Sequence, residues 1–194
     1  MADCANCEDK KCRHGADCYS VADRARELVE TQPCLSEYHK AATAIEGRHY
    51  LKKNRLQEII LFAKELELDT LGVAFCIGLS QEARTLVEIL REDFTVHSVC
   101  CKAGGIRKGE YELESISGSS EEVMCNPFGQ AEILNREGCQ LNIICGLCVG
   151  HEAVFTKLSK APIVTLITKD RVTGHNPAAA LYCPYLRNNL RSDK

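Results

Sequence analysis

The sequence predicts an α/β fold: an open, mainly parallel, three-layer sheet of the Rossmann-like or flavodoxin-like kind, with a small Cys-rich metal-binding segment at the N-terminus. From Thr70 onward, short apolar runs alternate with amphipathic stretches, and strands that alternate with helices form parallel sheets with right-handed crossovers. The first 20 residues are polar and Cys-rich, without periodicity. We therefore expect a Cys-rich segment over residues 1–40 and an α/β domain over residues 41–194.

Apolar spacing and capping residues place the individual elements. An apolar stripe at helical spacing predicts a helix from near Ala41 to near Leu66. Asn126 and Pro127 suit the N-cap and first position of one later helix, Ser80 suits the N-cap of another, and Pro184 should end or kink the last. The expected strands are residues 70–78, 94–101, 140–147 and 161–169, and the expected helices after Ser80 are 126–138, 151–159 and 176–186. The one long connection, 102–124, predicts a functional lid or a disordered insert.

Composition excludes several classes of function. The net charge of −3, the absence of Trp and an aromatic content of 6% argue against nucleic acid as a partner. No apolar run approaches the roughly 18 residues that a membrane span needs, and no secretory signal begins the chain, so we expect a cytoplasmic protein. In that reducing compartment, 13 cysteines indicate metal ligation or redox chemistry rather than disulfides. The isolated cysteines, expected to be ordinary buried side chains, are Cys34, Cys100, Cys139 and Cys183.

Most other cysteines follow strands or precede helices. Because ligands bind at the carboxyl ends of parallel strands, these residues should meet at one sheet edge. The expected group is Cys76, Cys101, Cys125, Cys148, His151 and His175. Cys125 and Cys148 should be thiolates, since each stands at a helix N-terminus. Together with Cys145, Cys148 forms a strand–C-x-x-C–helix arrangement that fits either a thioredoxin-like redox pair or a metal site completed by other strand ends; ligation explains more of the cysteines.

The N-terminal segment offers a second candidate metal site. Four cysteines follow the spacing C-x2-C-x4-C-x5-C, and they are Cys4, Cys7, Cys12 and Cys18. Such thiolates can close around one tetrahedral zinc or one iron–sulfur cluster of the 4Fe-4S kind. The spacing matches neither the zinc ribbon nor the bacterial ferredoxin run. A disordered cysteine tail is the alternative interpretation.

Several blocks of the sequence resemble the DUF1847 family over nearly the whole chain. They include "CANCEDKKCRHGADC", "LGVAFCIGLSQEA", "SVCCKAGG", "MCNPFGQAEILN", "GLCVGHEAVFTKLSKAP" and "TKDRVTGHNP". Members are uncharacterised proteins, mainly of anaerobic bacteria and archaea, often labelled as metal-binding. The resemblance implies that all ten cysteine and histidine positions grouped above belong to the family pattern. Cys145 departs from it, which weakens the C-x-x-C redox interpretation, and Glu152 stands where the family has Asp.

Three functions follow from these observations. The first is a metal-binding protein that holds an iron–sulfur cluster or zinc through the N-terminal cysteines, with a second Cys/His site at the sheet edge. The second is a cysteine-dependent redox or sulfur-transfer enzyme with Cys148 or Cys125 as nucleophile, His151 as base and the 102–124 loop closing over the site. The third is a non-catalytic metal sensor or carrier. Lys102, Asp170 and Arg171 should lie near the same edge and suit a small anionic ligand; a redox partner protein is the other expected partner.

Overall fold

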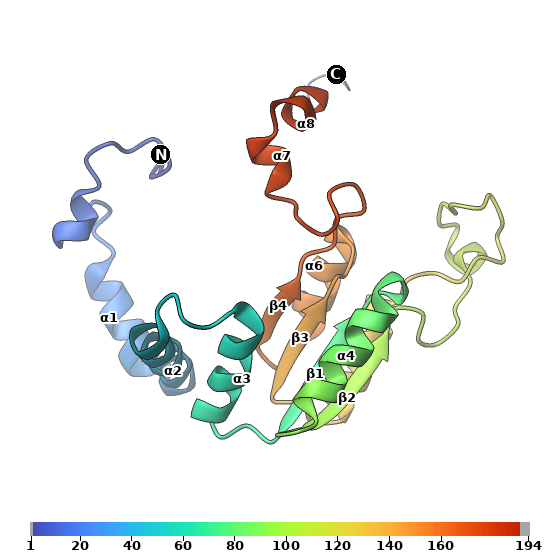
Figure 1. The fold of residues 1–194 in the computed structure, drawn as a ribbon, viewed down its shortest axis with the longest axis horizontal. Helices are drawn as coiled ribbons and strands as arrows, with labels where there is room; N and C mark the ends of the chain where they lie inside the picture. The colour runs from blue at the N-terminus through green and yellow to red at the C-terminus, as the bar shows by residue number, and fades with distance from the viewer. Residues whose placement is uncertain (1, 191–194) are drawn as a thin grey trace. The chain divides into compact units, whose positions relative to one another are not determined.

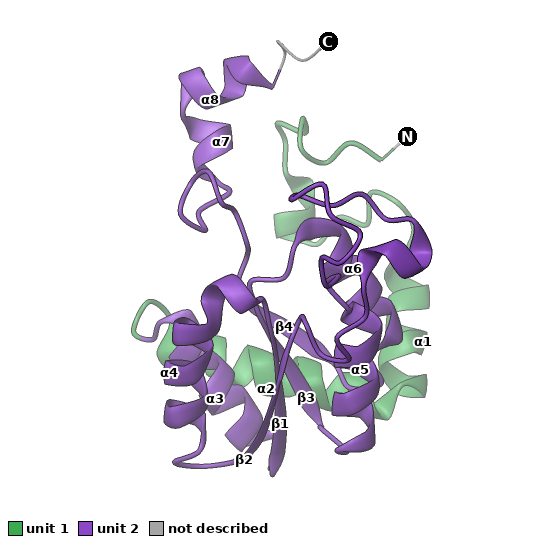
Figure 2. Ribbon diagram, turned by 90° about the vertical axis from the view of Figure 1, so that its right-hand side faces the viewer, with its two compact units in different colours: residues 1–52 green, residues 53–194 purple. Residues whose placement is uncertain are grey.

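A computed structural model describes residues 2–190 of the chain. It divides into two compact units, residues 1–52 and 53–194, which Figure 2 shows in two colours and which we describe separately. The first unit holds a short 3-10 helix η1 (Lys11–His14), α1 (Ala22–Thr31) and α2 (Pro33–His49), with α1 contacting α2. The predicted boundary at residue 40 falls within α2.

The second unit is built on a four-stranded, entirely parallel sheet (Figure 1), as the sequence predicts. Its strands are β1 (Thr70–Phe75), β2 (Thr95–Cys100), β3 (Leu141–Cys145) and β4 (Ile163–Ile167), in the order β2-β1-β3-β4. Phe75 pairs with Cys100 on one side and with Cys145 on the other. The carboxyl ends of the three strands are therefore level, and the residues that follow them share one edge.

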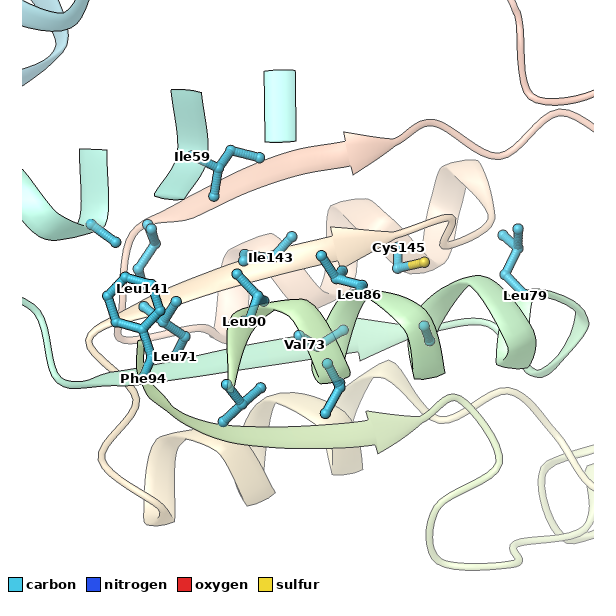
Figure 3. Close-up of a cluster of buried hydrophobic side chains, with 14 of the residues drawn as sticks. Ile59, Leu71, Val73, Leu79, Leu86, Leu90, Phe94, Leu141, Ile143 and Cys145 are labelled. Carbon is cyan, nitrogen blue, oxygen red and sulfur yellow. The ribbon is translucent and has the colours of Figure 1, made fainter. Parts of the chain in front are cut away.

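Helices cover both faces of this sheet, which gives the three expected layers. On one face, α3 (Arg55–Glu65) and α4 (Ser80–Leu90) bury their apolar stripes against Val73 and Ile143, as Figure 3 shows. On the other face, α5 (Pro127–Arg136) and α6 (Val149–Leu158) pack on Ala74 and Ile144. Adjacent strand residues thus point to opposite cores, since side chains alternate along a strand. The remaining elements are η2 (Ile77–Leu79), η3 (Lys108–Tyr111), α7 (Ala179–Tyr182) and α8 (Pro184–Asn189).

Two predicted helices are each divided in the structure. The helix expected over residues 41–66 is interrupted after α2, where Leu51 has a positive φ of 57°, and Asn54 starts α3 with a capping box. Near the C-terminus, the break predicted at Pro184 is present: α7 ends at Tyr182, and Pro184 begins a further helix, α8, because proline at the first helical position loses no hydrogen bond. Apolar periodicity did not reveal the break after α2.

The predicted helix caps have mixed outcomes. Asn126 is confirmed as the N-cap of α5, since its side-chain oxygen accepts a hydrogen bond of 2.8 Å from the Gly129 N–H. The prediction for Ser80 is wrong: Ser80 is the first residue of α4, and its hydroxyl donates to the carbonyl of Ile77. In α6 the helix begins at Val149, two residues earlier than predicted, which makes Cys148 its N-cap.

The 102–124 connection is an ordered loop held by its own hydrogen bonds. Glu122 organises its centre: one carboxylate oxygen accepts from the backbone N–H groups of Ile116 and Ser117, at 2.8 and 3.1 Å, and the other lies 2.8 Å from Lys108 Nζ. The Lys108 ammonium and the Ser117 N–H lower the pKa of Glu122 to about 2. The stabilisation of the loop by this carboxylate is therefore present above the ordinary glutamate range and is lost as the pH falls toward 2.

We expect Glu122→Gln to loosen this loop without unfolding the domain. The amide cannot match a carboxylate as a partner for Lys108 and the two N–H groups. Hydrogen exchange at neutral pH should show faster exchange of the Ile116 and Ser117 amides. Glu121→Gln is the matched control, because Glu121 only pairs with exposed Arg107 at 3.1 Å. Equal exchange in the two variants would contradict the role assigned to Glu122.

Among residues 2–190, no helix is long and apolar enough to span a membrane.

Candidate cysteine site at the sheet edge

The candidate site lies where the strand order of the sheet changes direction. From β1 the chain passes to β2 on one side, whereas from β3 it passes to β4 on the other, and ligands of open α/β sheets bind at such a switch point. Cys76 directly follows β1, and a tight turn leads from β3 to Cys148. Gly146 in that turn has φ of 72°, and a Cβ there would stand 2.0 Å from Leu79 Cδ1. The turn thus requires glycine.

Three cysteines from three segments meet at this edge: Cys76, Cys101 and Cys125. The backbone fixes two of them, since the Cys101 N–H donates to the Phe75 carbonyl at 2.8 Å and the Asn126 N–H donates to the Cys101 carbonyl at 2.7 Å. The Cys101 thiol donates its one hydrogen to Cys125 and also lies within hydrogen-bonding reach of Cys76, and its sulfur accepts from the Ile77 N–H at 3.3 Å. Cys101 therefore links the other two sulfurs.

The proton of this group is held on Cys101. Donation from the Cys101 thiol, supported by the charges of Lys102 and His151 and opposed by partial burial, lowers the pKa of Cys125 to about 5. The same hydrogen bond to Cys125, together with burial, raises the pKa of Cys101 far above that of an ordinary thiol. At neutral pH the arrangement is thus a Cys125 thiolate beside a protonated Cys101.

Cations accompany the remaining thiols. Burial of Cys76 would raise its pKa, but hydrogen bonds from the Lys169 ammonium and the Gly78 N–H outweigh burial, and the pKa lies below the ordinary value. Arg171 Nη2 donates to Cys148 Sγ at 3.1 Å, and this hydrogen bond raises the pKa of Arg171. The Lys169–Arg171 segment therefore supplies a separate cation to each of two sulfurs.

Two residues that support the site were not identified from the sequence. From the sequence, Lys169 was expected only as the last residue of a strand, with no role at the site. Gln130, fully buried on α5, donates from Nε2 to the carbonyls of Phe75 at 3.1 Å and Val99 at 2.8 Å, which fixes the strand ends before Cys76 and Cys101. Within the described part of the chain, its Oε1 has no hydrogen-bond partner. In the sequence, the one sign of this role was a glutamine at a core position of an amphipathic helix.

The other predicted site residues have different surroundings. His151 lies on the first turn of α6, near enough to Cys125 to favour its thiolate. His175, at φ of 66°, accepts a hydrogen bond of 3.1 Å at Nδ1 from the Asp170 N–H. Cys145 is fully buried in the core on the α4 face (Figure 3), and burial raises its pKa to about 11. This is the reverse of the activated thiol that a thioredoxin-like pair needs.

The N-terminal cysteines are all exposed to solvent in their unit. Cys4 Sγ lies 3.5 Å from the Tyr19 hydroxyl, and the Cys7 N–H donates to the Cys4 carbonyl at 3.3 Å. Over residues 2–190, no group of three or more Cys, His, Asp or Glu side chains is arranged so that it could hold a metal ion. Zinc or an iron–sulfur cluster, here or at the sheet edge, stays a prediction.

The isolated cysteines only partly match expectation. Cys139 is buried, as expected, and burial raises its pKa to about 11. Cys100 and Cys183 are half-buried. The prediction for Cys34 is wrong, because it lies exposed near the start of α2, where neighbouring apolar residues gave no reliable sign of burial.

Comparison with known proteins identifies relatives of this chain. The family model described as "Protein of unknown function (DUF1847)" matches residues 15–166. "Uncharacterized protein MJ0455" of Methanocaldococcus jannaschii is 45% identical over 199 aligned residues, which cover 98% of this chain and 99% of that protein. No solved structure matches the chain. The chain therefore belongs to the DUF1847 family, as its sequence blocks predict.

Proposed function

We propose that the protein is a cysteine-dependent thiol enzyme in which Cys125 is the nucleophile and Cys101 is its partner thiol. The observation that carries this proposal is the hydrogen bond from the Cys101 thiol to the Cys125 sulfur at the switch point of the sheet. A thiolate is the reactive form of cysteine. Lys102 and His151, both near Cys125, favour that form.

The pair fits attack on divalent sulfur, and thiol–disulfide exchange with a small-molecule disulfide shows the role of each cysteine. The Cys125 thiolate attacks one substrate sulfur, and the first substrate thiolate leaves with the electron pair of the broken S–S bond. Cys125 is then neutral in the mixed disulfide, so the main cause of the raised Cys101 pKa disappears. Cys101 can now lose its proton, attack the Cys125 sulfur and release the second substrate thiolate. The substrate gains two electrons, and Cys101 and Cys125 end as a disulfide.

Oxidation of the reduced protein by a small-molecule disulfide tests this proposal. We expect peptide mapping to find a Cys101–Cys125 disulfide first, and Cys125→Ser to leave Cys101 reduced. Cys34→Ser is the control, because it removes an exposed cysteine from α2. The proposal fails if Cys101 and Cys125 stay reduced while Cys34 or the N-terminal cysteines are oxidised.

The presence of Cys76, Cys101 and Cys125 at one sheet edge supports a second candidate function, the binding of a thiophilic metal, for which these side chains would have to rearrange from their described positions. A thiolate-bound iron–sulfur cluster has ligands of this kind, and Lys102 and Lys169 would balance its negative charge. The N-terminal cysteines would hold a further metal. Anaerobic purification followed by iron, zinc and acid-labile sulfide analysis separates the candidates. Metal that is lost in Cys76→Ser favours the sheet-edge centre, whereas metal-free protein that forms the Cys101–Cys125 disulfide favours thiol chemistry.

A further inference from the structure

We infer that the substrate of the sheet-edge site is a small anion that carries a transferable sulfur atom, of the class to which thiosulfate belongs. This inference rests on the proposed function, because it uses Cys125 as the nucleophile. It adds a substrate class that the thiols alone do not define. Three cations placed around the thiols carry it: Lys102, Lys169 and Arg171.

Each of the three cations is directed to the site by a specific contact. Lys169 Nζ donates to Cys76 Sγ, and Arg171 Nη2 donates to Cys148 Sγ at 3.1 Å. Lys102 Nζ donates to the Val123 carbonyl at 2.5 Å and lies beside Cys125. The cations thus come from two segments, the loop after β2 and the loop after β4, and face different cysteines of one edge.

Carboxylates do not neutralise these cations. Within residues 2–190, neither Lys102, Lys169 nor Arg171 forms an ion pair with an Asp or Glu. The neighbouring cations of the 102–124 loop behave differently, since Arg107 pairs with Glu121 at 3.1 Å and Lys108 with Glu122 at 2.8 Å. Three cations that lie beside the thiols without a carboxylate partner attract an anion more strongly than paired cations do.

Asp170 and Glu152, two carboxylates close to this edge, accept their hydrogen bonds from groups other than these cations. Asp170 Oδ1 accepts from the backbone N–H groups of Val172 and Thr173, at 2.8 and 3.0 Å. Glu152 Oε1 accepts from the Thr165 hydroxyl at 2.9 Å. The first turn of α6 has no side-chain cap on its N–H groups, which adds donors for an oxyanion next to Arg171.

The Cys125 thiolate limits which class of anion can react at the site. A thiolate attacks divalent sulfur readily, so an anion with a terminal sulfur on an oxyanion matches both the nucleophile and the cations. With thiosulfate, the Cys125 thiolate attacks the outer sulfur, and a new S–S bond forms at Cys125. The S–S bond of thiosulfate breaks, and its electron pair leaves with sulfite, whose charge Lys169 and Arg171 would stabilise. Cys125 ends as a deprotonated persulfide, and no external oxidant or reductant takes part.

Thiosulfate itself is the probe for the experiment, with the reduced full-length chain kept under anaerobic conditions. We expect release of sulfite and a mass increase of one sulfur atom on the peptide that contains Cys125. Arg171→Gln and Lys169→Gln should each slow sulfite release about tenfold, the loss typical of one charged contact of about 1.4 kcal/mol. Arg84→Gln is the matched control, because Arg84 is exposed on α4 and only 4.0 Å from Glu88.

A neutral reagent separates failure of the inference from failure of the proposed function. Iodoacetamide reacts with the Cys125 thiolate and needs no anion site. The Arg171 and Lys169 variants should therefore slow the reaction with thiosulfate more than they slow alkylation by iodoacetamide. Rapid alkylation of Cys125 without sulfite release or added sulfur would overturn the inference alone. Slow alkylation of Cys125 would overturn the proposed function with it. Equal rates of sulfite release by Arg171→Gln and Arg84→Gln would show that Arg171 does not bind the anion.

Discussion

Cys125→Ser is expected to remove the fastest-reacting thiol of the protein at pH 6. With a pKa of about 5, Cys125 is mostly thiolate at that pH, whereas an ordinary cysteine of pKa about 8.5 is thiolate at only about 0.3%. The lower basicity of the Cys125 thiolate costs about 40-fold in intrinsic nucleophilicity. The two effects together leave Cys125 about eightfold faster than an ordinary exposed cysteine toward iodoacetamide.

The pH profile of alkylation checks the physical cause of this reactivity. Because the pKa of Cys125 is lowered, its rate should reach a plateau above about pH 6 and fall as the pH drops through 5. Cys34, exposed on α2, serves as the internal reference, and Cys34→Ser should keep the fast phase. A Cys125 profile that still rises between pH 7 and 9 would show that the Cys101 hydrogen bond and Lys102 do not stabilise the thiolate.

Phe155→Ala is expected to cause the largest loss of folding stability of any single change considered for this domain. Phe155 is fully buried between α6 and the sheet, packed with Leu134, Ile144 and Leu147. Removing a buried aromatic ring loses its transfer free energy and leaves a cavity, which together cost about 3–5 kcal/mol. Urea unfolding should measure this as a lower midpoint with little change in slope.

The same helix offers a matched control for Phe155→Ala. Leu158 lies one turn further along α6 but is 41% exposed, so Leu158→Ala should cost about 1 kcal/mol or less. Because α6 also carries His151 and follows Cys148, the Phe155 variant should in addition slow the reaction of the sheet-edge thiols. Equal destabilisation by the two variants would mean that the burial of Phe155 does not anchor α6.

The gathering of the cysteines could be predicted because it depends on local pattern and one topological rule. Each strand was visible as an apolar run, and parallel strands end at the same edge, so Cys76 and Cys101 had to lie near one another. Cys125 followed from the Asn-Pro helix start after it. These inferences needed only residues that are adjacent in the sequence.

The partners of those cysteines could not be predicted in the same way. Lys169 reaches Cys76 across 93 positions of sequence, and Gln130 reaches the Phe75 carbonyl across 55. Such contacts depend on the strand order β2-β1-β3-β4, which alternating elements alone do not determine. The break at Leu51 was missed for a local reason, because a leucine with positive φ is rare and gives no signal in an apolar pattern.

The two ends of the 102–124 loop meet at Cys101 and Cys125, and this closeness would connect oxidation with folding. A disulfide there would close a ring of about 25 residues, and removing that much chain freedom from the unfolded state stabilises a fold by about 3.5 kcal/mol in the chain-entropy account. By thermodynamic linkage, the folded protein would favour the disulfide by the same amount, about 75 mV in reduction potential. The oxidised protein would then resist both denaturant and reductant more strongly than its reduced form.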